Sequence, residues 1–272
     1  KFNHTLYFLI LCLLLTGMAH YVTANKEHTG LANTIASASG THFRCDMSSY
    51  RPYGSSRACV IKTVEAADGV VALLGNSHAQ MYAPMVLETS PANLDLLLVP
   101  LNGCLPTTSI NVSRSCLERA KINLEAVLSD KNIKTVILAT TWYAESYVDS
   151  DGNEVNRTAL KGSISELVSE IVGRGKLPIL FSPIAIPEKD YASELARQLR
   201  FGGISEKDAL DKMKVPRSSY DEEFEDTNTH FEMLMGDAFV KIYDDLCDQN
   251  NCMFGNEDLF YFADGTHLSE SA

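Results

Sequence analysis

The stretch VVALLGNSHAQ, residues 70–80, decides the fold, because an apolar run stops at a glycine and polar residues follow at once. A run that is apolar at every position is typical of a parallel strand covered by helices on both faces. Gly75, Asn76 and Ser77 then form either an ordinary turn, which favours these residue types, or a loop that presents Ser77 as a nucleophile. The rest of the chain must distinguish the two interpretations.

Apolar runs and helical patterns alternate along the chain. The predicted strands are residues 70–74, 94–99, 135–140 and 177–181, with a weaker fifth at 260–262. The predicted helices are residues 79–87, 116–129, 159–173, 188–200 and 229–246. This alternation predicts a doubly wound α/β sheet. In such sheets the site lies beyond the carboxyl ends of the strands, and Ser77 follows such an end. Residues 202–226 have no clear period and are expected to form a surface loop with one short helix, or a lid.

The composition of the 272 residues is that of a globular protein, and the formal net charge is -12. Nucleic-acid phosphates need clustered Lys and Arg, and the sequence has no basic stripe. We therefore expect no nucleic-acid partner. The acidic run DEEFED, residues 221–226, is typical of a solvated surface.

The chain begins with a nearly uncharged segment, Leu6 to Val22, which has roughly the length that spans a bilayer. It is interpreted as a signal peptide or as a membrane helix, with a buried core helix as the alternative. Either of the first two places the rest of the chain outside the cytoplasm. We expect residues 1–24 to be this segment, 25–60 a linker and 61–272 the catalytic domain.

The cysteines favour an oxidising compartment. Cys12 lies in the apolar segment, and the other six fall as three pairs that are close in sequence. Six cysteines allow 15 connectivities. Pairing of neighbours predicts the disulfides Cys45–Cys59, Cys104–Cys116 and Cys247–Cys252. No CxxC motif occurs and the cysteines are not mixed with histidines at ligand spacing, so no metal and no cofactor are expected.

A second polar stretch, YFADGTHLS at residues 261–269, supplies partners for Ser77. Asp264 and His267 are three residues apart, so one short turn can present both side chains. A serine hydroxyl needs a base to take its proton, and a carboxylate fixes the tautomer of that base. Ser77 is therefore predicted as nucleophile, His267 as base and Asp264 as orienter. The nucleophile motif GxSxG of α/β-hydrolases is absent.

These motifs resemble those of a known family. GNSHAQ is similar to the first block, GDSH, of the SGNH (GDSL-type) hydrolase superfamily, and DGTH is similar to its last block, DxxH. More narrowly, LLGNSHAQ, NGCLP (102–106), VILATTWY (136–143) and FADGTHLS resemble the SGNH domain at the carboxyl end of acyltransferase-3 membrane proteins. The resemblance implies a three-layer α/β/α fold with a parallel, flavodoxin-like sheet of about five strands.

The resemblance also implies an oxyanion hole made by the backbone N–H groups of Ser77 and Gly103. The family usually has Asp where Asn76 stands, and its GxND block is missing, with Trp142 and Tyr143 in that region. Asn76 and Trp142 are candidate substrate-binding residues. For Trp142 the alternatives are stacking on a sugar ring and packing as a core or rim aromatic.

The function implied is extracytoplasmic O-acyl transfer. In that family a membrane domain carries acyl groups across the bilayer, and the SGNH domain passes them to a hydroxyl of a cell-surface glycan such as O-antigen, peptidoglycan or exopolysaccharide. The expected partners are such a membrane acyltransferase domain, a glycan acceptor and the membrane itself. The domain is expected to be membrane-anchored and periplasmic or extracellular. The alternatives are a secreted carbohydrate or lipid esterase and a non-catalytic glycan-binding module.

Overall fold

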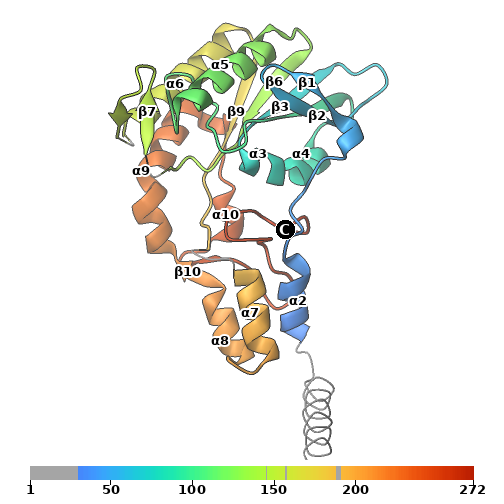
Figure 1. Cartoon of the computed structure of the whole chain (residues 1–272), viewed down its shortest axis with the longest axis vertical. Coiled ribbons are helices and arrows are strands. Elements are labelled where there is room, and N and C mark those ends of the chain that lie inside the picture. The colour runs from blue at the N-terminus through green and yellow to red at the C-terminus, as the bar shows by residue number, and fades with distance from the viewer. Residues whose placement is uncertain (1–29, 145, 157, 188–190) are drawn as a thin grey trace, which may run out of the picture.

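A seven-stranded sheet forms the centre of the molecule (Figure 1). The computed structural model describes residues 30–144, 146–156, 158–187 and 191–272. The strand order is β1-β2-β4-β3-β6-β9-β11. The strands are β1 (Tyr50–Tyr53), β2 (Ser56–Lys62), β3 (Gly69–Gly75), β4 (Leu94–Pro100), β6 (Ile133–Leu138), β9 (Leu177–Phe181) and β11 (Phe239–Val240). The last five of these are parallel, whereas β1 and β2 form an antiparallel edge.

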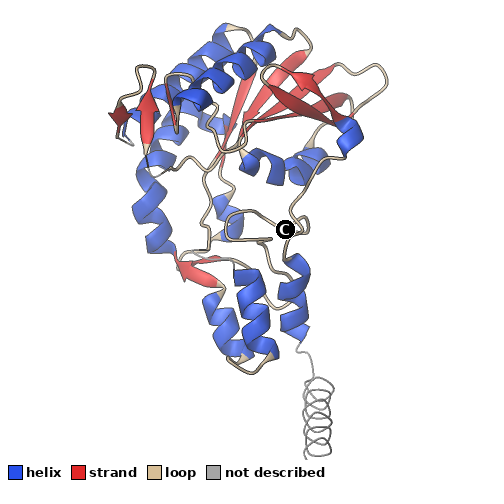
Figure 2. Ribbon diagram, viewed as in Figure 1, coloured by secondary structure: helices blue, strands red, loops and turns tan. Residues whose placement is uncertain are grey.

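Helices cover both faces of the sheet (Figure 2). One face packs against α5 (Arg114–Ser129) and α6 (Thr158–Gly173), and the other against α3 (Ser77–Met81) and α4 (Ala83–Thr89). Successive strand residues point to opposite faces, so Leu73 lies in one apolar core and Leu74 in the other, each without exposed surface. This double burial explains the uninterrupted apolar run.

A helical region lies below the sheet in Figure 1. It contains α2 (Gly30–Ala38), α7 (Tyr191–Arg200), α8 (Glu206–Lys212) and α10 (Tyr243–Leu246), and the strands β10 (Lys214–Pro216) and β12 (Asn251–Met253) pair beside it. The long helix α9 (Arg217–Met235) runs from there to the sheet. Short strands β5 (Ile110–Asn111), β7 (Tyr147–Asp149) and β8 (Glu154–Val155) form a small separate sheet.

Four predictions differ from the structure. The last part of the expected linker, residues 25–60, forms β1 and most of β2, because β2 pairs with β4 and buries Ala58 and Cys59. Residues 260–262 form no strand and make only isolated bridges. Phe260 and Phe262 are buried as core side chains instead, and β11 is the fifth parallel strand.

The expected helix at residues 229–246 is also divided. It comprises the end of α9, a 3-10 turn (Gly236–Ala238), β11 and α10. Gly236 adopts φ +53, a conformation that ends α9 and favours glycine. Residues 202–226, expected to be a surface loop with one short helix or a lid, contain more regular structure than one short helix, since they hold α8, β10 and the first half of α9.

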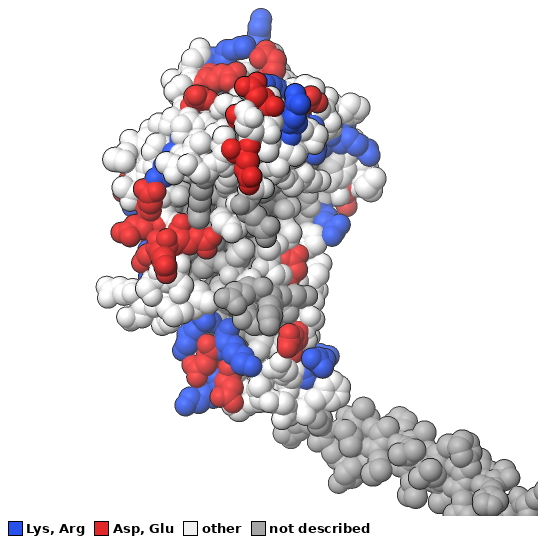
Figure 3. Space-filling model, turned by 60° about the vertical axis from the view of Figure 1, so that its left-hand side comes forward, with Lys and Arg blue, Asp and Glu red and all other residues white. Residues whose placement is uncertain are grey.

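The acidic run lies on α9. Phe224 is buried, whereas its acidic neighbours Glu222, Glu223 and Glu225 are exposed. Figure 3 turns this flank toward the viewer and shows acidic side chains gathered on it.

All three predicted disulfides are present. Cys45–Cys59 joins the segment before β1 to β2, Cys104–Cys116 joins the loop after β4 to α5, and Cys247–Cys252 joins the end of α10 to β12. The apolar segment Leu6 to Val22 lies outside the described residues. Within the described part of the chain, no helix combines the length and apolar character needed to cross a bilayer.

Candidate active site

Ser77 stands where β3 passes into α3, at the carboxyl edge of the sheet. Asn76 is the N-cap of this helix, and its side-chain oxygen accepts a hydrogen bond of 2.9 Å from the His78 N–H. Gly75 is required by close approach, because a Cβ atom there would lie 1.7 Å from the Ala139 carbonyl oxygen. As the first residue of the helix, Ser77 has a backbone N–H without an intrahelical acceptor.

Asp264 and His267 form a hydrogen-bonded pair. The Asp264 Oδ2 and His267 Nδ1 atoms are 2.8 Å apart. The other carboxylate oxygen accepts hydrogen bonds from the backbone N–H groups of Thr266 and His267, at 2.7 and 2.8 Å. One turn therefore fixes both side chains, as the spacing predicts, and leaves the far nitrogen of His267 for another partner.

The charge of Asp264 is stabilised by these contacts. Burial alone would raise the pKa of its carboxyl group, but hydrogen bonds from Thr266 and His267 outweigh it and lower the pKa to about 2. Asp264 is therefore an anion at any physiological pH. An anion at this position favours the His267 tautomer that carries its proton on Nδ1.

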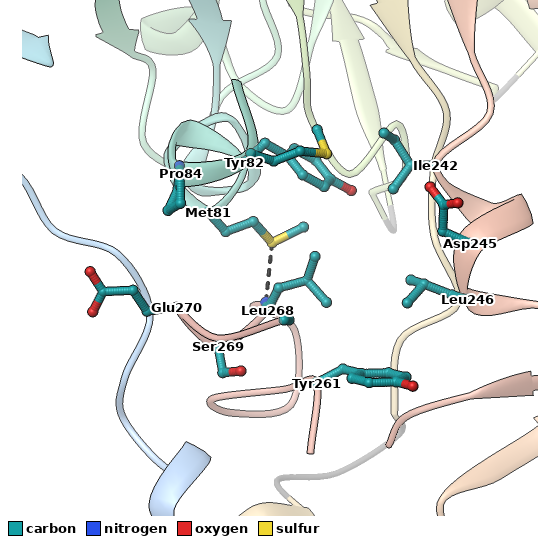
Figure 4. Close-up of a pocket in the computed structure, with 12 residues that line it drawn as sticks. Met81, Tyr82, Pro84, Ile242, Asp245, Leu246, Tyr261, Leu268, Ser269 and Glu270 are labelled. Atoms are coloured by element: carbon teal, nitrogen blue, oxygen red, sulfur yellow. Dashed lines mark hydrogen bonds between the residues drawn. The ribbon is translucent and has the colours of Figure 1, made fainter. Parts of the chain in front are cut away.

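The site has two arms: the end of β3 and α3, which carry Ser77, and residues 263–270, which carry Asp264 and His267. The two arms meet at α3. The Leu268 N–H donates to the sulfur of Met81 at 3.3 Å, drawn as a dashed line in Figure 4. The ring centroids of His267 and His78 are 5.5 Å apart, and His78 follows Ser77 directly. Among the described residues, Ser77 Oγ makes no hydrogen bond to the His267 ring. Such catalytic contacts often tighten only when substrate binds.

His78 itself is not a second base. Its side chain is only 3% exposed, and neither ring nitrogen makes a hydrogen bond of normal geometry to a described residue. Burial, and next the charge of His267, lower the pKa of His78 to about 3, although Asp264 and the nearby Thr266 carbonyl act in the opposite direction. His78 is therefore a buried, neutral imidazole that directly follows Ser77 in the chain.

Two further predicted residues, Gly103 and Asn76, lie in turns beside Ser77. Gly103 lies in the turn after β4, and the ends of β4 and β3 are joined by the bond from Leu101 N–H to the Gly75 carbonyl at 2.6 Å. Gly103 has a φ of +73, a conformation that favours glycine. The Asn76 amide bonds within the protein, to His78 and, at 3.2 Å, to Thr141 Oγ1, so its two polar groups serve the turn.

Trp142 is not available to a sugar ring. Its side chain has no exposed surface, its Nε1–H donates to the Phe181 carbonyl at 2.7 Å, and its ring packs edge-on against Phe231. Of the two alternatives for Trp142, the structure therefore supports packing as a core aromatic and not stacking on a sugar ring. Its φ of +53, unusual for a bulky residue, turns the chain after β6.

A cavity of about 810 Å³ opens next to the two arms. It lies between the segments that follow β6 and β9, the helix α9 and the turn that carries Asp264. The lining residues are His78, Thr140, Thr141, Tyr143, Ile184, Ile186, Pro187, Glu223, Phe224, Gly265 and Thr266. The buried hydroxyl of Thr140 has no hydrogen-bond partner among the described residues. Six of these residues lie in the motifs GNSHAQ, VILATTWY and FADGTHLS. The other five, Ile184, Ile186, Pro187, Glu223 and Phe224, lie in no motif, and only the rule that sites lie beyond strand ends points to this region.

A smaller cavity of about 300 Å³ lies beside Leu268 (Figure 4). Its lining is mainly apolar, with Met81, Tyr82 and Leu246 facing it. We associate the larger cavity with the site, because it is lined by His78, which follows Ser77, and by Gly265 and Thr266, which lie between Asp264 and His267.

Comparison with known proteins identifies the family. Among proteins of curated function, none matches the chain significantly in sequence. The periplasmic domain of a lipopolysaccharide acetyltransferase from Salmonella ser. Paratyphi A is similar in structure, with a TM-score of 0.47 and 11% identity over 76% of this chain and 79% of that one. A likeness this distant assigns no activity. The family model described as "SGNH domain (fused to AT3 domains)" matches residues 44–272. The chain therefore belongs to the family of SGNH domains that occur fused to acyltransferase-3 domains, as its motifs predict.

Proposed function

We propose that the chain is the extracytoplasmic O-acyltransferase domain of an acyltransferase-3 protein, and that it passes an acyl group through Ser77 to a hydroxyl of a cell-surface glycan. The observation that carries this proposal is the Asp264–His267 pair held against the helix that begins at Ser77. Family membership supports a membrane acyltransferase domain as the donor partner. Three disulfides support a compartment outside the cytoplasm.

The first half-reaction is acylation of the serine. Ser77 Oγ attacks the acyl carbonyl carbon while His267 Nε2 takes the hydroxyl proton, and Asp264 stabilises the imidazolium that forms. The carbonyl oxygen becomes an oxyanion, for which the N–H groups of Ser77 and Gly103 are the proposed donors. The tetrahedral intermediate collapses, the bond to the donor breaks, and the leaving group takes the proton from His267.

The second half-reaction returns the enzyme to its starting state. A sugar hydroxyl gives its proton to His267 and attacks the acyl-serine, and Ser77 Oγ then leaves and regains that proton. Water competes at about 55 M, so the acceptor must be held in line, where effective molarities can reach about 10⁵ M. The cavity beside the two arms is the proposed acceptor site.

The lining of this cavity favours an uncharged, hydroxyl-rich acceptor. Thr140, Thr141 and Tyr143 offer hydroxyl groups, and Ile184 and Phe224 offer apolar surface for the faces of sugar rings. Among the described residues, the lining includes Glu223 but no Lys or Arg, and such a lining disfavours a phosphorylated or sulfated group. A neutral sugar hydroxyl fits this lining better than an anionic one.

The test follows the fate of the acetyl group. Acetate release from an activated acetyl ester is measured with and without cell-wall and O-antigen oligosaccharides, and acetylated sugar is sought by mass spectrometry. We expect slow hydrolysis alone, faster acetyl consumption with a suitable acceptor, and no activity for Ser77→Ala. Fast hydrolysis without acetylated sugar across a broad acceptor panel would instead favour a secreted esterase.

A non-catalytic glycan-binding module makes a different prediction. It would bind oligosaccharide but would not react with a serine-directed phosphonate at Ser77. Intact-mass analysis after treatment with a fluorophosphonate therefore distinguishes this alternative, with Ser77→Ala as the control.

A further inference from the structure

The segment of residues 40–43 crosses the site and is hydrogen-bonded to both of its arms. The Gly40 N–H donates to the Ala263 carbonyl at 2.8 Å, and the Glu270 N–H donates to the Thr41 carbonyl at 2.9 Å. On the other arm, Gln80 Nε2 donates to the Phe43 carbonyl at 2.7 Å. Figure 1 shows this chain rising from α2 past the carboxyl terminus toward the sheet edge.

These bonds reach residues next to the proposed triad. Ala263 precedes Asp264, and Gln80 lies one helical turn after Ser77. The segment 40–43 lies outside the residues that match the family model, which begin at residue 44. It is thus a feature of this chain that the family match does not describe.

His42 brings its side chain onto the base. The ring centroids of His42 and His267 are 5.4 Å apart with an interplanar angle of 29°, a stacked arrangement. His42 is half-buried, and its Nδ1 atom is buried without a hydrogen-bond partner among the described residues. The contact between the two side chains is therefore made through the ring faces.

We propose that His42 is a positioning residue, whose ring holds the His267 imidazole in the orientation that reaches Ser77. This proposal rests on the proposed function of Ser77 and His267. The bond to Asp264 holds one nitrogen of His267 but does not by itself set the tilt of the ring. The ring of His78 lies 5.5 Å from it, tilted by 39°, whereas the ring of His42 is stacked on it. A second ring stacked on its face restricts that tilt.

The charge state of His42 suits this role. Burial, then the charges of Arg44 and His267, lower the pKa of His42, and only Asp264 acts in the opposite direction. A neutral ring does not repel the imidazolium that forms when His267 takes the proton of Ser77. The backbone bonds of residues 40–43 do not involve the His42 side chain, so substituting it leaves them in place.

The experiment compares the full chain with the variants His42→Ala, His42→Gln and His42→Phe. Reaction of Ser77 with a fluorophosphonate gives two readouts, the rate of labelling and the final fraction labelled. Turnover of an activated acetyl ester gives kcat and KM. Misplacement of a catalytic group by about 1 Å can cost 10²-fold in rate.

We expect His42→Ala and His42→Gln to lower the labelling rate and kcat about tenfold, with KM within about twofold and the fraction labelled unchanged. His42→Phe, which keeps a ring, should restore the rate to within about threefold of the wild type. If His42→Ala does not fold, the contrast between Gln and Phe decides.

Three results would overturn the inference. An unchanged labelling rate in His42→Ala or, where that variant does not fold, in His42→Gln would show that the stacked ring does not position the base. A lower labelled fraction at an unchanged rate would assign His42 to folding. A wild-type protein that is not labelled at Ser77 would reject the proposed function itself, and the inference with it.

Discussion

Ser77 stands between a buried parallel strand and a capped helix, whereas Asp264 and His267 stand on a segment with neither. The Ser77 arm is placed by the ladder of β3, by the Asn76 cap and by the close approach of Gly75 to the Ala139 carbonyl. The other arm is held by single contacts, among them the bridge between Phe262 and Leu268.

The difference teaches which part of the site is rigid by construction. A nucleophile at a strand-to-helix junction is held by the whole sheet, so few single substitutions can move it. The base depends on individual hydrogen bonds and ring contacts, so its position should respond to substitutions several residues away. The predictions below test this contrast, from the largest expected effect to the smallest.

The largest effects are expected at the chemical groups themselves. Ser77→Ala and His267→Ala should each lower kcat/KM for a small acetyl ester on the order of 10³-fold or more, because triad members act as a unit. His230→Ala, on α9 and bonded to Ser165, is the matched histidine control and should change activity by less than about twofold. A folded Ser77→Ala protein with wild-type activity would remove Ser77 from the mechanism.

A smaller loss is expected for Asp264→Asn, on the order of 10²-fold or more, because the amide presents an N–H to His267 and favours the wrong tautomer. The variant should also change the acid stability. The pKa of Asp264 is lowered to about 2 in the folded state, against about 3.9 in unfolded chains. Its stabilisation is therefore present above about pH 4 and is lost as the pH falls toward 2.

Urea unfolding at several pH values between 2 and 6 measures this effect. The free energy of unfolding of Asp264→Asn should depend less steeply on pH below 4 than that of the wild type. Parallel curves for the two proteins would mean that the hydrogen bonds to Asp264 do not stabilise its charged form.

A stability effect without a large catalytic effect is expected at the disulfide Cys104–Cys116. It closes a loop of 13 residues, so replacing both cysteines by serine should lower the free energy of unfolding by about 3 kcal/mol. Because Ser77 is held by the sheet, kcat should fall less than about tenfold. A loss as large as that of Ser77→Ala would mean that the turn of Gly103 is essential to the chemistry.

The smallest effect is expected for Asn76→Asp. The aspartate keeps the oxygen that caps the His78 N–H. The Thr141 hydroxyl, which accepts from the Asn76 amide and donates to the Tyr143 carbonyl, can turn to donate to the aspartate. Activity should stay within about twofold, whereas Asn76→Ala should cost about 1 kcal/mol of stability through loss of the cap. Thermal unfolding and ester turnover measure the two quantities. Equal destabilisation by Asp and Ala would argue against the cap.

The sequence predicts the Ser77 arm well for a physical reason. Strands buried on both faces, such as residues 70–74, are uniformly apolar, and a polar turn must follow them. The Asp264–His267 pair is also predictable, because its geometry is local and needs only a three-residue spacing.

Other features depend on distant contacts and are not visible in local patterns. Residues 260–262 resemble a strand, yet Phe260 and Phe262 fill the core from a segment without a ladder. Trp142 lies in a motif, and only the structure shows that its side chain is buried and packs against Phe231. The stacking of His42 on His267 joins residues 225 positions apart, beyond the reach of any spacing rule.

The most direct test of the account is a double-mutant cycle between the two arms. The values of kcat/KM are measured for Ser77→Ala, His267→Ala and the protein that carries both substitutions. If the arms form one catalytic unit, the double variant should be about as inactive as either single variant. Losses that multiply in the double variant would show that Ser77 and His267 act independently, which would contradict the account.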